Sequence, residues 1–454
     1  MVPQKSFLKA IVRLLTSALI LAAFLDLAPS SLGAASAGGT AILSQRDRVV
    51  VQNAWLKWRL DNIIPSLMRR EGIDLWLVIN REYTEDPVYL SLMPRPTMNS
   101  GGTVALIFDD RGAAGVERLS CSPHAVAALY KNIRSARTKT QFETLADFIR
   151  ERNPGKIGID VSANWPLADG LTASLKDKLE KALGPELSKR FVPAENLVVG
   201  WLETRSPEEQ SVYRQICGIA HGIIADFLSN NVITPDVTTT DDVVWWARQR
   251  VADLGLETWF QPSLSIVRAK AEEAKYADRR TIRRGDLLHC DFGIRYLGLC
   301  TDMQWHAYVC KAGEEDAPQG LKDALRRANQ LADLIMNEFK EGRSGQEITS
   351  SVVSKGESAG LRPSIYSHPL GFYGHAAGMT PDSRSVNSID EGNPLRWNYP
   401  LHLDTAYAIE FSSASTVPEW DNQDVRIAYE ETAIFTGAGC RFVDGRQTKF
   451  LIIK

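Results

Sequence analysis

In the first half of the chain, segments whose apolar positions have the period of a helix alternate with segments that have the pattern of a strand. Residues 48–71 have a helical period, and short patterns of buried strands follow at 73–79, 103–108 and 156–160. Segments that alternate in this way predict a three-layer α/β domain. No group of residues in this half has the spacing of metal ligands.

The second half combines long amphipathic helices with strands that carry polar residues. Ser206-Pro207-Glu208-Glu209 predicts a helix start, because serine caps the first turn, proline is tolerated there and a glutamate follows the cap by three residues. Further helices are predicted at 241–254, at 319–339 and after Ser344. We therefore expect an α+β domain over residues 201–454, preceded by the α/β domain over residues 38–200.

Two aspartates lie inside strand patterns between Gly285 and Cys310. Asp291 and Asp302 are eleven residues apart, although strands are normally depleted in aspartate. Carboxylates on neighbouring strands can face each other, and in a partly buried place they repel unless a proton or a cation lies between them. A single aspartate in a strand is more often an edge or turn residue. The DFG triplet at 291–293 also occurs in kinases, but the other kinase motifs are missing.

Later strand patterns make a metal site the best interpretation of the two aspartates. His368 and His375 flank a glycine-containing turn, and glutamates follow at Glu410 and at Glu430-Glu431. Several carboxylates with one imidazole suit a pair of hard or borderline divalent cations. Two such ions about 3.5–4 Å apart hold a water between them and make it a nucleophile near neutral pH.

The order and spacing of these residues resemble the metal-binding series of the pita-bread metallopeptidase superfamily, in its aminopeptidase P, prolidase and creatinase branch. The resemblance rests on the eleven-residue step between the aspartates, the seven-residue step from His368 to His375 and the strand at 430–436. It implies an α/β N-terminal domain followed by an α+β pita-bread (creatinase-like) catalytic domain. The metal ligands that it implies are Asp291, Asp302, His368, Glu410 and Glu430, with Asp302 and Glu430 as bridging carboxylates.

The resemblance also implies roles in the chemistry. Glu410 would take a proton from the attacking water, and His375 would donate a hydrogen bond to the tetrahedral oxygen or to the leaving nitrogen. Arg426 precedes the last ligand on the same predicted strand, and we expect it to orient Asp302 or Glu430.

The sequence departs from the family at several positions. The family usually carries a further histidine shortly before the first aspartate, but no histidine occurs between His221 and His289. Gln261 can form hydrogen bonds in that region, but it cannot act as an acid. Glu431 is the alternative to Glu430 as the last ligand, because the preceding strand is two residues longer than is usual in the family.

The implied function is that of an exported dinuclear peptidase, which removes the residue before a proline or cleaves a dipeptide with a C-terminal proline. A metal-bridged hydroxide would attack the scissile carbonyl, with manganese as the first choice of metal and cobalt, zinc and iron as alternatives. Two other interpretations stay open: a metal-dependent hydrolase or lyase of a small non-peptide substrate, and a binding protein of this fold without catalysis. Relatives indicate a homodimer.

Residues 1–37 predict a cleavable signal peptide. Basic residues precede an apolar run at 14–25, and a stretch of small residues ends in Ala35-Ser36-Ala37. The apolar run is shorter than the roughly 20 residues of a membrane span. We therefore expect a periplasmic or secreted protein that has no stable membrane span after cleavage.

Composition narrows the classes of partner. The net charge is −3 and no basic run is present, so nothing favours nucleic acid as a partner. A hydrophobic share of 44% and a charged share of 24% are ordinary for a globular protein, which we expect to act on a peptide or another small molecule. The six cysteines contain no CxxC motif, and export would permit disulfides among them.

Overall fold

The computed structural model describes residues 42–97, 99–124, 126, 129–134, 138–276, 278–383 and 398–454. Residues Leu43–Lys454 form one compact unit. The predicted signal peptide, residues 1–37, lies outside the described residues. No helix within the described ranges is both long and apolar enough to cross a membrane. All six cysteines lie within these ranges, and each is a free thiol.

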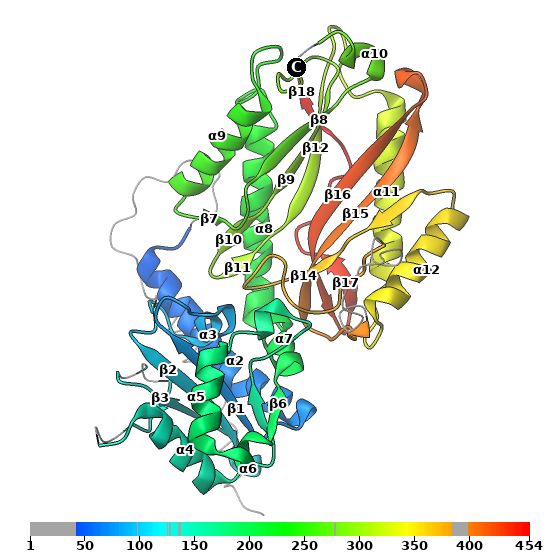
Figure 1. The fold of residues 1–454 in the computed structure, drawn as a ribbon. Helices are drawn as coiled ribbons and strands as arrows, with labels where there is room; N and C mark the ends of the chain where they lie inside the picture. Colours follow the sequence, from blue (N-terminus) through cyan, green and yellow to red (C-terminus); the bar gives the residue numbers. More distant parts are fainter. Residues whose placement is uncertain are drawn as a thin grey trace, which may run out of the picture. The chain divides into compact units, whose positions relative to one another are not determined.

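The first half of the chain forms a six-stranded mixed sheet with helices on both of its faces (Figure 1). The strand order is β4-β3-β2-β1-β5-β6. Its strands are β1 (Leu75–Arg81), β2 (Thr103–Asp110), β3 (Val116–Cys121), β4 (Lys131–Asn132), β5 (Ile157–Ile159) and β6 (Phe191–Pro193). Its helices are α2 (Gln45–Glu71), α3 (Pro87–Leu92), α4 (Gln141–Arg152), α5 (Ala173–Leu183), α6 (Pro185–Ser188) and α7 (Glu195–Glu203).

Alternate residues of these strands pack against different helices. Trp76 and Val78 of β1 belong to the core shared with α2 and α7, whereas Leu75 and Leu77 belong to the core shared with α4 and α5. Both faces of β1 are therefore apolar, as its sequence requires. The three-layer α/β arrangement predicted from the sequence is confirmed.

The second half is built on a nine-stranded sheet with the order β13-β15-β16-β12-β9-β8, on which β14 pairs with β15, β17 with β16 and β18 with β12. Its strands are β8 (Ser263–Val267), β9 (Leu287–Phe292), β12 (Met303–Val309), β13 (Pro363–Ile365), β14 (His368–Leu370), β15 (Thr405–Val417), β16 (Gln423–Thr436), β17 (Gly439–Phe442) and β18 (Leu451–Ile453). A smaller sheet contains β7 (Glu257–Thr258), β10 (Ile294–Tyr296) and β11 (Leu299–Cys300).

Helices accompany these strands, and two of them begin at the serines that the sequence predicts as caps. Ser206 and Ser344 cap their helices with the predicted reciprocal glutamate, Glu209 and Glu347 respectively. The helices are α8 (Pro207–Phe227), α9 (Thr240–Asp253), α10 (Lys270–Glu273), α11 (Gln319–Glu338) and α12 (Gly345–Ser358). The predicted α+β fold of this half is confirmed.

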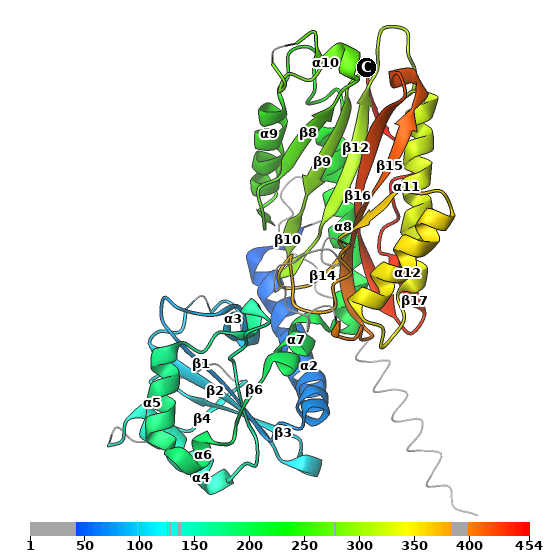
Figure 2. The same cartoon turned by 45° about the vertical axis from the view of Figure 1, so that its right-hand side comes forward.

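Helix α8 covers one face of the nine-stranded sheet, along the back of strands β9 and β12 in Figures 1 and 2. Phe227 of α8 packs on Phe292 with the ring centroids 5.6 Å apart. Because side chains alternate along a strand, Asp291 points to the opposite face from its neighbour Phe292. The apolar residues of β9 thus hold the helix, and its aspartate faces away from it.

A buried cluster of three charged side chains joins α2 to the start of α8. Glu209 lies 3.0 Å from Arg59 and 3.3 Å from Arg205, and all three side chains are at most 1% exposed. Burial acts to raise the pKa of Glu209, but the two arginines outweigh it and hold the pKa below its usual value. The ring of Phe372 lies against both guanidinium groups. The cluster therefore also anchors the segment between His368 and His375.

We expect Glu209→Gln to destabilise the protein strongly, because it leaves two buried arginines without a counter-charge. Breaking a buried ion pair by removing one partner costs about 3–5 kcal/mol in free energy of unfolding. Urea unfolding followed by circular dichroism measures this loss. Lys57→Met is the control, since it breaks the exposed Lys57–Asp61 pair on α2 and should cost less than about 1 kcal/mol. Equal losses in the two variants would contradict a structural role for the buried cluster.

Candidate metal centre

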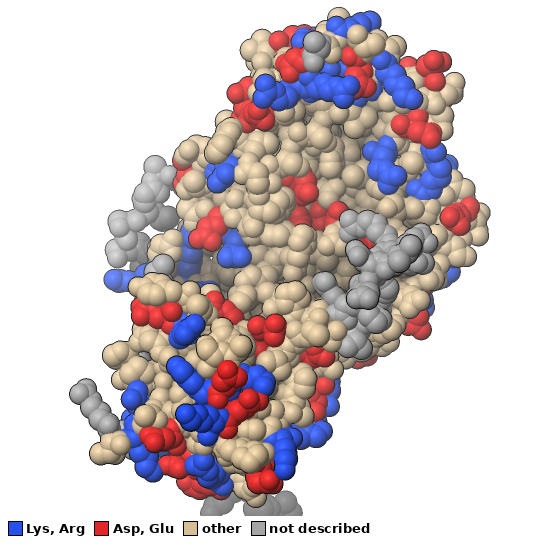
Figure 3. All heavy atoms as spheres, viewed as in Figure 1, with Lys and Arg blue, Asp and Glu red and all other residues tan. Residues whose placement is uncertain are grey.

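The side chains predicted as metal ligands lie together on the face of the nine-stranded sheet that points away from α8. They are Asp291 in β9, Asp302 immediately before β12, His368 at the start of β14, Glu410 in β15 and Glu430 in β16. Strand pairing sets Glu410 opposite Glu430. Figure 3 shows a small group of acidic side chains over these strands, set among uncharged ones.

The distances around His368 suit a shared cation better than direct hydrogen bonds. Its Nε2 lies 3.4 Å from Glu430 Oε1, 3.6 Å from Asp302 Oδ2 and 3.9 Å from Glu410 Oε2. Ligand atoms that share one metal ion through bonds of about 2.0–2.2 Å lie about 3.0–3.6 Å from one another. The first two distances fit this range, and Glu410 is slightly outside it.

Several of these atoms are buried without a hydrogen-bond partner among the described residues. They are His368 Nε2, Glu430 Oε1, Asp302 Oδ1 and Asp291 Oδ1. Unpaired polar atoms in a protein interior are costly, so their convergence on one place calls for a ligand. An oxygen-rich set with one imidazole fits a divalent cation.

Burial and mutual repulsion both disfavour the ionised form of the carboxyl groups in the cluster. Burial, and then the charge of Glu410, raises the pKa of Asp291 to about 7. Burial and the neighbouring carboxylates raise the pKa of Asp302 and that of Glu430 well above their usual values. Burial acts to lower the pKa of His368, but Glu430 and Glu410 outweigh it and raise the pKa. Cations among these groups would relieve the repulsion.

Two sets of three ligands overlap in this cluster. Asp291, Asp302 and Glu430 bring three carboxylate oxygens within 4.8 Å of one another, and His368, Glu410 and Glu430 do the same with a ring nitrogen and two oxygens. Glu430 belongs to both sets. Each set could hold a cation, and Glu430 is common to both.

His375 lies beside this cluster and is exposed. Its ring centroid is 4.6 Å from that of His368, and one of its nitrogens is within 4.8 Å of ligand atoms of Asp302 and His368. Trp259 contacts His375 edge-on with the centroids 5.3 Å apart. A Cβ on Gly374 would come within 2.2 Å of the Trp259 ring, so glycine is required for this close approach.

The sequence did not predict a role for Trp259, although this residue lies between His221 and His289, where the family usually has a further histidine. Its Nε1 donates to the carbonyl of Thr301, next to Asp302, at 2.7 Å. Trp259 thereby connects the short link before β12, which carries Asp302, to the segment that carries His375. Gln261, the residue considered in that region, is exposed and accepts a hydrogen bond from Arg248 at 2.6 Å.

The structure separates the two candidates for the last ligand. Glu431 points to the α8 face, where its carboxylate lies 3.0 Å from His221 Nε2 and accepts a hydrogen bond from Trp305 Nε1 at 2.6 Å. Glu430 points to the opposite face and into the cluster. The alternation of side chains along β16 thus favours Glu430.

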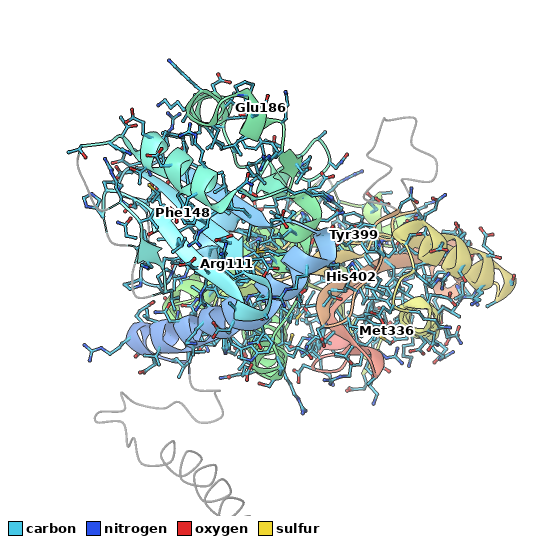
Figure 4. The ribbon with its side chains drawn as sticks, turned by 90° about the horizontal axis from the view of Figure 1, so that it is seen from below. Arg111, Phe148, Glu186, Met336, Tyr399 and His402 are labelled. Atoms are coloured by element: carbon cyan, nitrogen blue, oxygen red, sulfur yellow. The ribbon has the colours of Figure 1, made fainter. Side chains whose placement is uncertain are left out.

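Arg426 does not lie where the sequence interpretation put it. It is exposed, and its Nη1 donates to Ser412 Oγ at 2.6 Å. Four residues along a strand span about 13 Å, which separates Arg426 from Glu430 on the same face. The prediction that Arg426 orients Asp302 or Glu430 is therefore wrong. His402, which precedes strand β15, packs on Tyr399 with the ring centroids 5.5 Å apart (Figure 4).

Sequence reasoning missed Gln304, which contacts two of the predicted ligands. Its Nε2 donates to Glu430 Oε2 at 2.9 Å and to Glu410 Oε1 at 3.2 Å. Its Oε1 lies 2.9 Å from His289 Nε2. The available signal was its position: Gln304 follows Asp302 by two residues on a strand and so shares its face.

Comparisons with known proteins place the chain among related sequences and folds. A family model described as metallopeptidase family M24 matches residues 211–441. None of the curated proteins compared with the chain matches it. Solved structures match over nearly their whole lengths at low identity, which shows the fold.

Three of these structures indicate the range of proteins that share it. An X-Pro aminopeptidase from Thermotoga maritima has 16% identity and a TM-score of 0.60, covering 85% of this chain and 99% of its own. A Xaa-Pro dipeptidase from Bacillus anthracis has 16% identity and a TM-score of 0.57, covering 89% and 99%. The N-terminal domain of the FACT complex subunit SPT16 from Cicer arietinum (chickpea) has 12% identity and a TM-score of 0.59, covering 88% and 99%.

The two neighbouring glutamates provide a matched test of the metal centre. Glu430→Gln should weaken metal binding more than about 100-fold, the upper end of the loss caused by merely supporting residues. Glu431→Gln should retain the metal, because that carboxylate faces His221. Metal content after dialysis, measured by mass spectrometry, compares the two. Loss of metal from the Glu431 variant with retention in the Glu430 variant would reverse the assignment.

Proposed function

The chain belongs to metallopeptidase family M24, and from this premise we propose that it is a dinuclear peptidase of the Xaa-Pro aminopeptidase or dipeptidase type. The observation that carries the proposal is the set of three carboxylates and one imidazole whose unpaired atoms converge on the open face of the sheet. The proposed substrate class comes from the likeness of the fold to an X-Pro aminopeptidase and to a Xaa-Pro dipeptidase.

The ligand set is proposed to be Asp291, Asp302, His368, Glu410 and Glu430. Divalent ions bound there would lower the pKa of a shared water, which is the chemistry that such ions supply to peptide hydrolysis. Manganese is the first choice, because the set contains four oxygen donors for one nitrogen, and cobalt, zinc and iron are alternatives.

Two residues of the chain handle protons in this proposal. Glu410 accepts the proton of the attacking water, and its side chain is 25% exposed, so solvent reaches it. His375 donates a hydrogen bond to the carbonyl oxygen or to the leaving nitrogen, since it lies beside the ligands without being buried among them. Trp259 restricts the segment that carries His375.

Two other functions are the second candidates. One is a metal-dependent hydrolase or lyase of a small non-peptide substrate, and the other is a binding protein without catalysis. The likeness to the SPT16 domain supports a binding protein, because that domain has the same fold at a similar TM-score. A small non-peptide substrate is supported by the lack of a histidine between His221 and His289, where the family usually has one. Both differ from the leading proposal in what the purified protein cleaves.

Export and a homodimer are further parts of the proposal. Export is supported by the basic residues, the apolar run and the small-residue stretch of residues 1–37. Sequencing the N-terminus of the mature protein tests it, and a chain that retains residue 1 would contradict it. The dimer is inferred from relatives, and light scattering of the same sample tests it.

The function is tested on the purified mature protein by metal analysis and two cleavage assays. We expect about two divalent ions per chain, in line with a two-ion site. We also expect release of the first residue from an Xaa-Pro-Xaa tripeptide or cleavage of an Xaa-Pro dipeptide, and loss of both activities with a chelator. Two ions without cleavage would indicate a non-peptide substrate. No metal after incubation with excess Mn²⁺ would indicate a binding protein.

His375→Ala should lower turnover about 10²–10⁴-fold, the usual contribution of a positioned proton donor, while the metal content stays at the wild-type level. The reason is that His375 lies beside the ligands on the exposed side. Steady-state kinetics and metal analysis of one preparation check both parts. Loss of metal in this variant would mean that the roles of His368 and His375 are exchanged.

A further inference from the structure

A row of hydrogen-bonded side chains runs across the sheet and ends on two of the proposed ligands. Ser265 in β8 pairs with His289 in β9, and Gln304 in β12 pairs with Glu430 in β16. Ser265 Oγ lies 3.2 Å from His289 Nδ1, and His289 Nε2 lies 2.9 Å from Gln304 Oε1. The row therefore connects the exposed edge strand β8 to the proposed metal centre.

Charge fixes the direction of the Gln304 amide. If the amide were reversed, its carbonyl oxygen would face two carboxylates, so the nitrogen must point to Glu410 and Glu430. The carbonyl oxygen then accepts a hydrogen bond from His289 Nε2. A neutral imidazole that donates through Nε2 accepts through Nδ1, and the hydroxyl of Ser265 is the donor there. The Ser265 hydroxyl also lies 3.4 Å from the backbone carbonyl of His289, so its single proton is shared between that oxygen and Nδ1.

Gln304 and His368 contact different oxygens of the same two carboxylates. The amide donates to Glu410 Oε1 and Glu430 Oε2, whereas His368 faces Glu410 Oε2 and Glu430 Oε1. The amide therefore does not compete for the oxygens that face the imidazole. Each of its two N–H groups holds one glutamate at a fixed rotation.

We propose that Gln304 is a positioning residue that fixes the orientation of Glu410 and Glu430 toward divalent cations, and that His289, supported by Ser265, holds the carbonyl end of its amide in place. The proposal rests on the proposed function, because it assumes that the two glutamates bind metal. Hydrogen bonds from supporting residues restrict the rotation of ligand carboxylates and so raise metal affinity.

The simpler role for Gln304 would be to fill space between the strands. Gln304 is 5% exposed, so any substitution there also changes packing. The two roles differ in what His289 must provide. A space-filling glutamine needs only a neighbour of similar size, whereas an oriented amide needs a hydrogen-bond donor at the position of His289 Nε2.

The test is Mn²⁺ binding to metal-free protein by calorimetry. Gln304→Met keeps the length of the side chain and removes the amide, and it should weaken Mn²⁺ binding about 10–100-fold, as for other residues that support ligands. His289→Leu should weaken binding in the same direction. His289→Gln should restore most of the affinity, because its amide can still donate to Gln304. Gln249→Met, on the exposed face of α9, is the control and should bind like wild type.

The outcomes separate this inference from the proposed function. Wild-type protein that binds no Mn²⁺ would overturn the proposed function, and the inference with it. Wild-type binding with unchanged or tighter binding by Gln304→Met would overturn the inference alone. Equal losses in His289→Leu and His289→Gln would also overturn it, because size rather than donation would then decide the effect. The His289 pair gives this answer even if Gln304→Met does not fold.

Discussion

Repulsion among four carboxylates that share one face of a sheet is the constraint on which the centre depends. Three of the five proposed ligands are almost fully buried, and burial combined with like charge raises the pKa of Asp291 to about 7. Such a set is costly in any fold unless cations or protons compensate it. The low exposure of Asp302 and Glu430 therefore indicates a site for cations more directly than the mere presence of acidic residues does.

The sheet holds these repelling side chains together because each ligand lies in or next to a different strand. Pairing of β15 with β16 sets Glu410 opposite Glu430, and α8 takes up the apolar alternate residues on the other face. The ligands cannot move apart without breaking ladder hydrogen bonds. The buried charges of Arg59, Arg205 and Glu209 extend the same restraint, through Phe372, to the segment between His368 and His375.

Much of this arrangement was predictable because it depends on local patterns. Aspartates inside strands, the step from Asp291 to Asp302 and the serine helix caps are all visible in the sequence. Period-two alternation also distinguishes Glu430 from Glu431, but only once a neighbour such as His221 shows which face is covered. Gln304 was missed because its meaning depends on contacts with strands more than one hundred residues away. Arg426 was misplaced because nearness in sequence along a strand is not nearness in space.

The choice of an amide at position 304 follows from the same electrostatics. A lysine or arginine there would also donate to Glu410 and Glu430, but its charge would neutralise the site and compete with cations. A hydroxyl group has a single donor and could hold only one of the two glutamates. A carboxamide donates twice and carries no charge, so it restrains both carboxylates and leaves their negative charge available to metal ions. His289 completes this logic, because a neutral imidazole can orient the amide without adding charge.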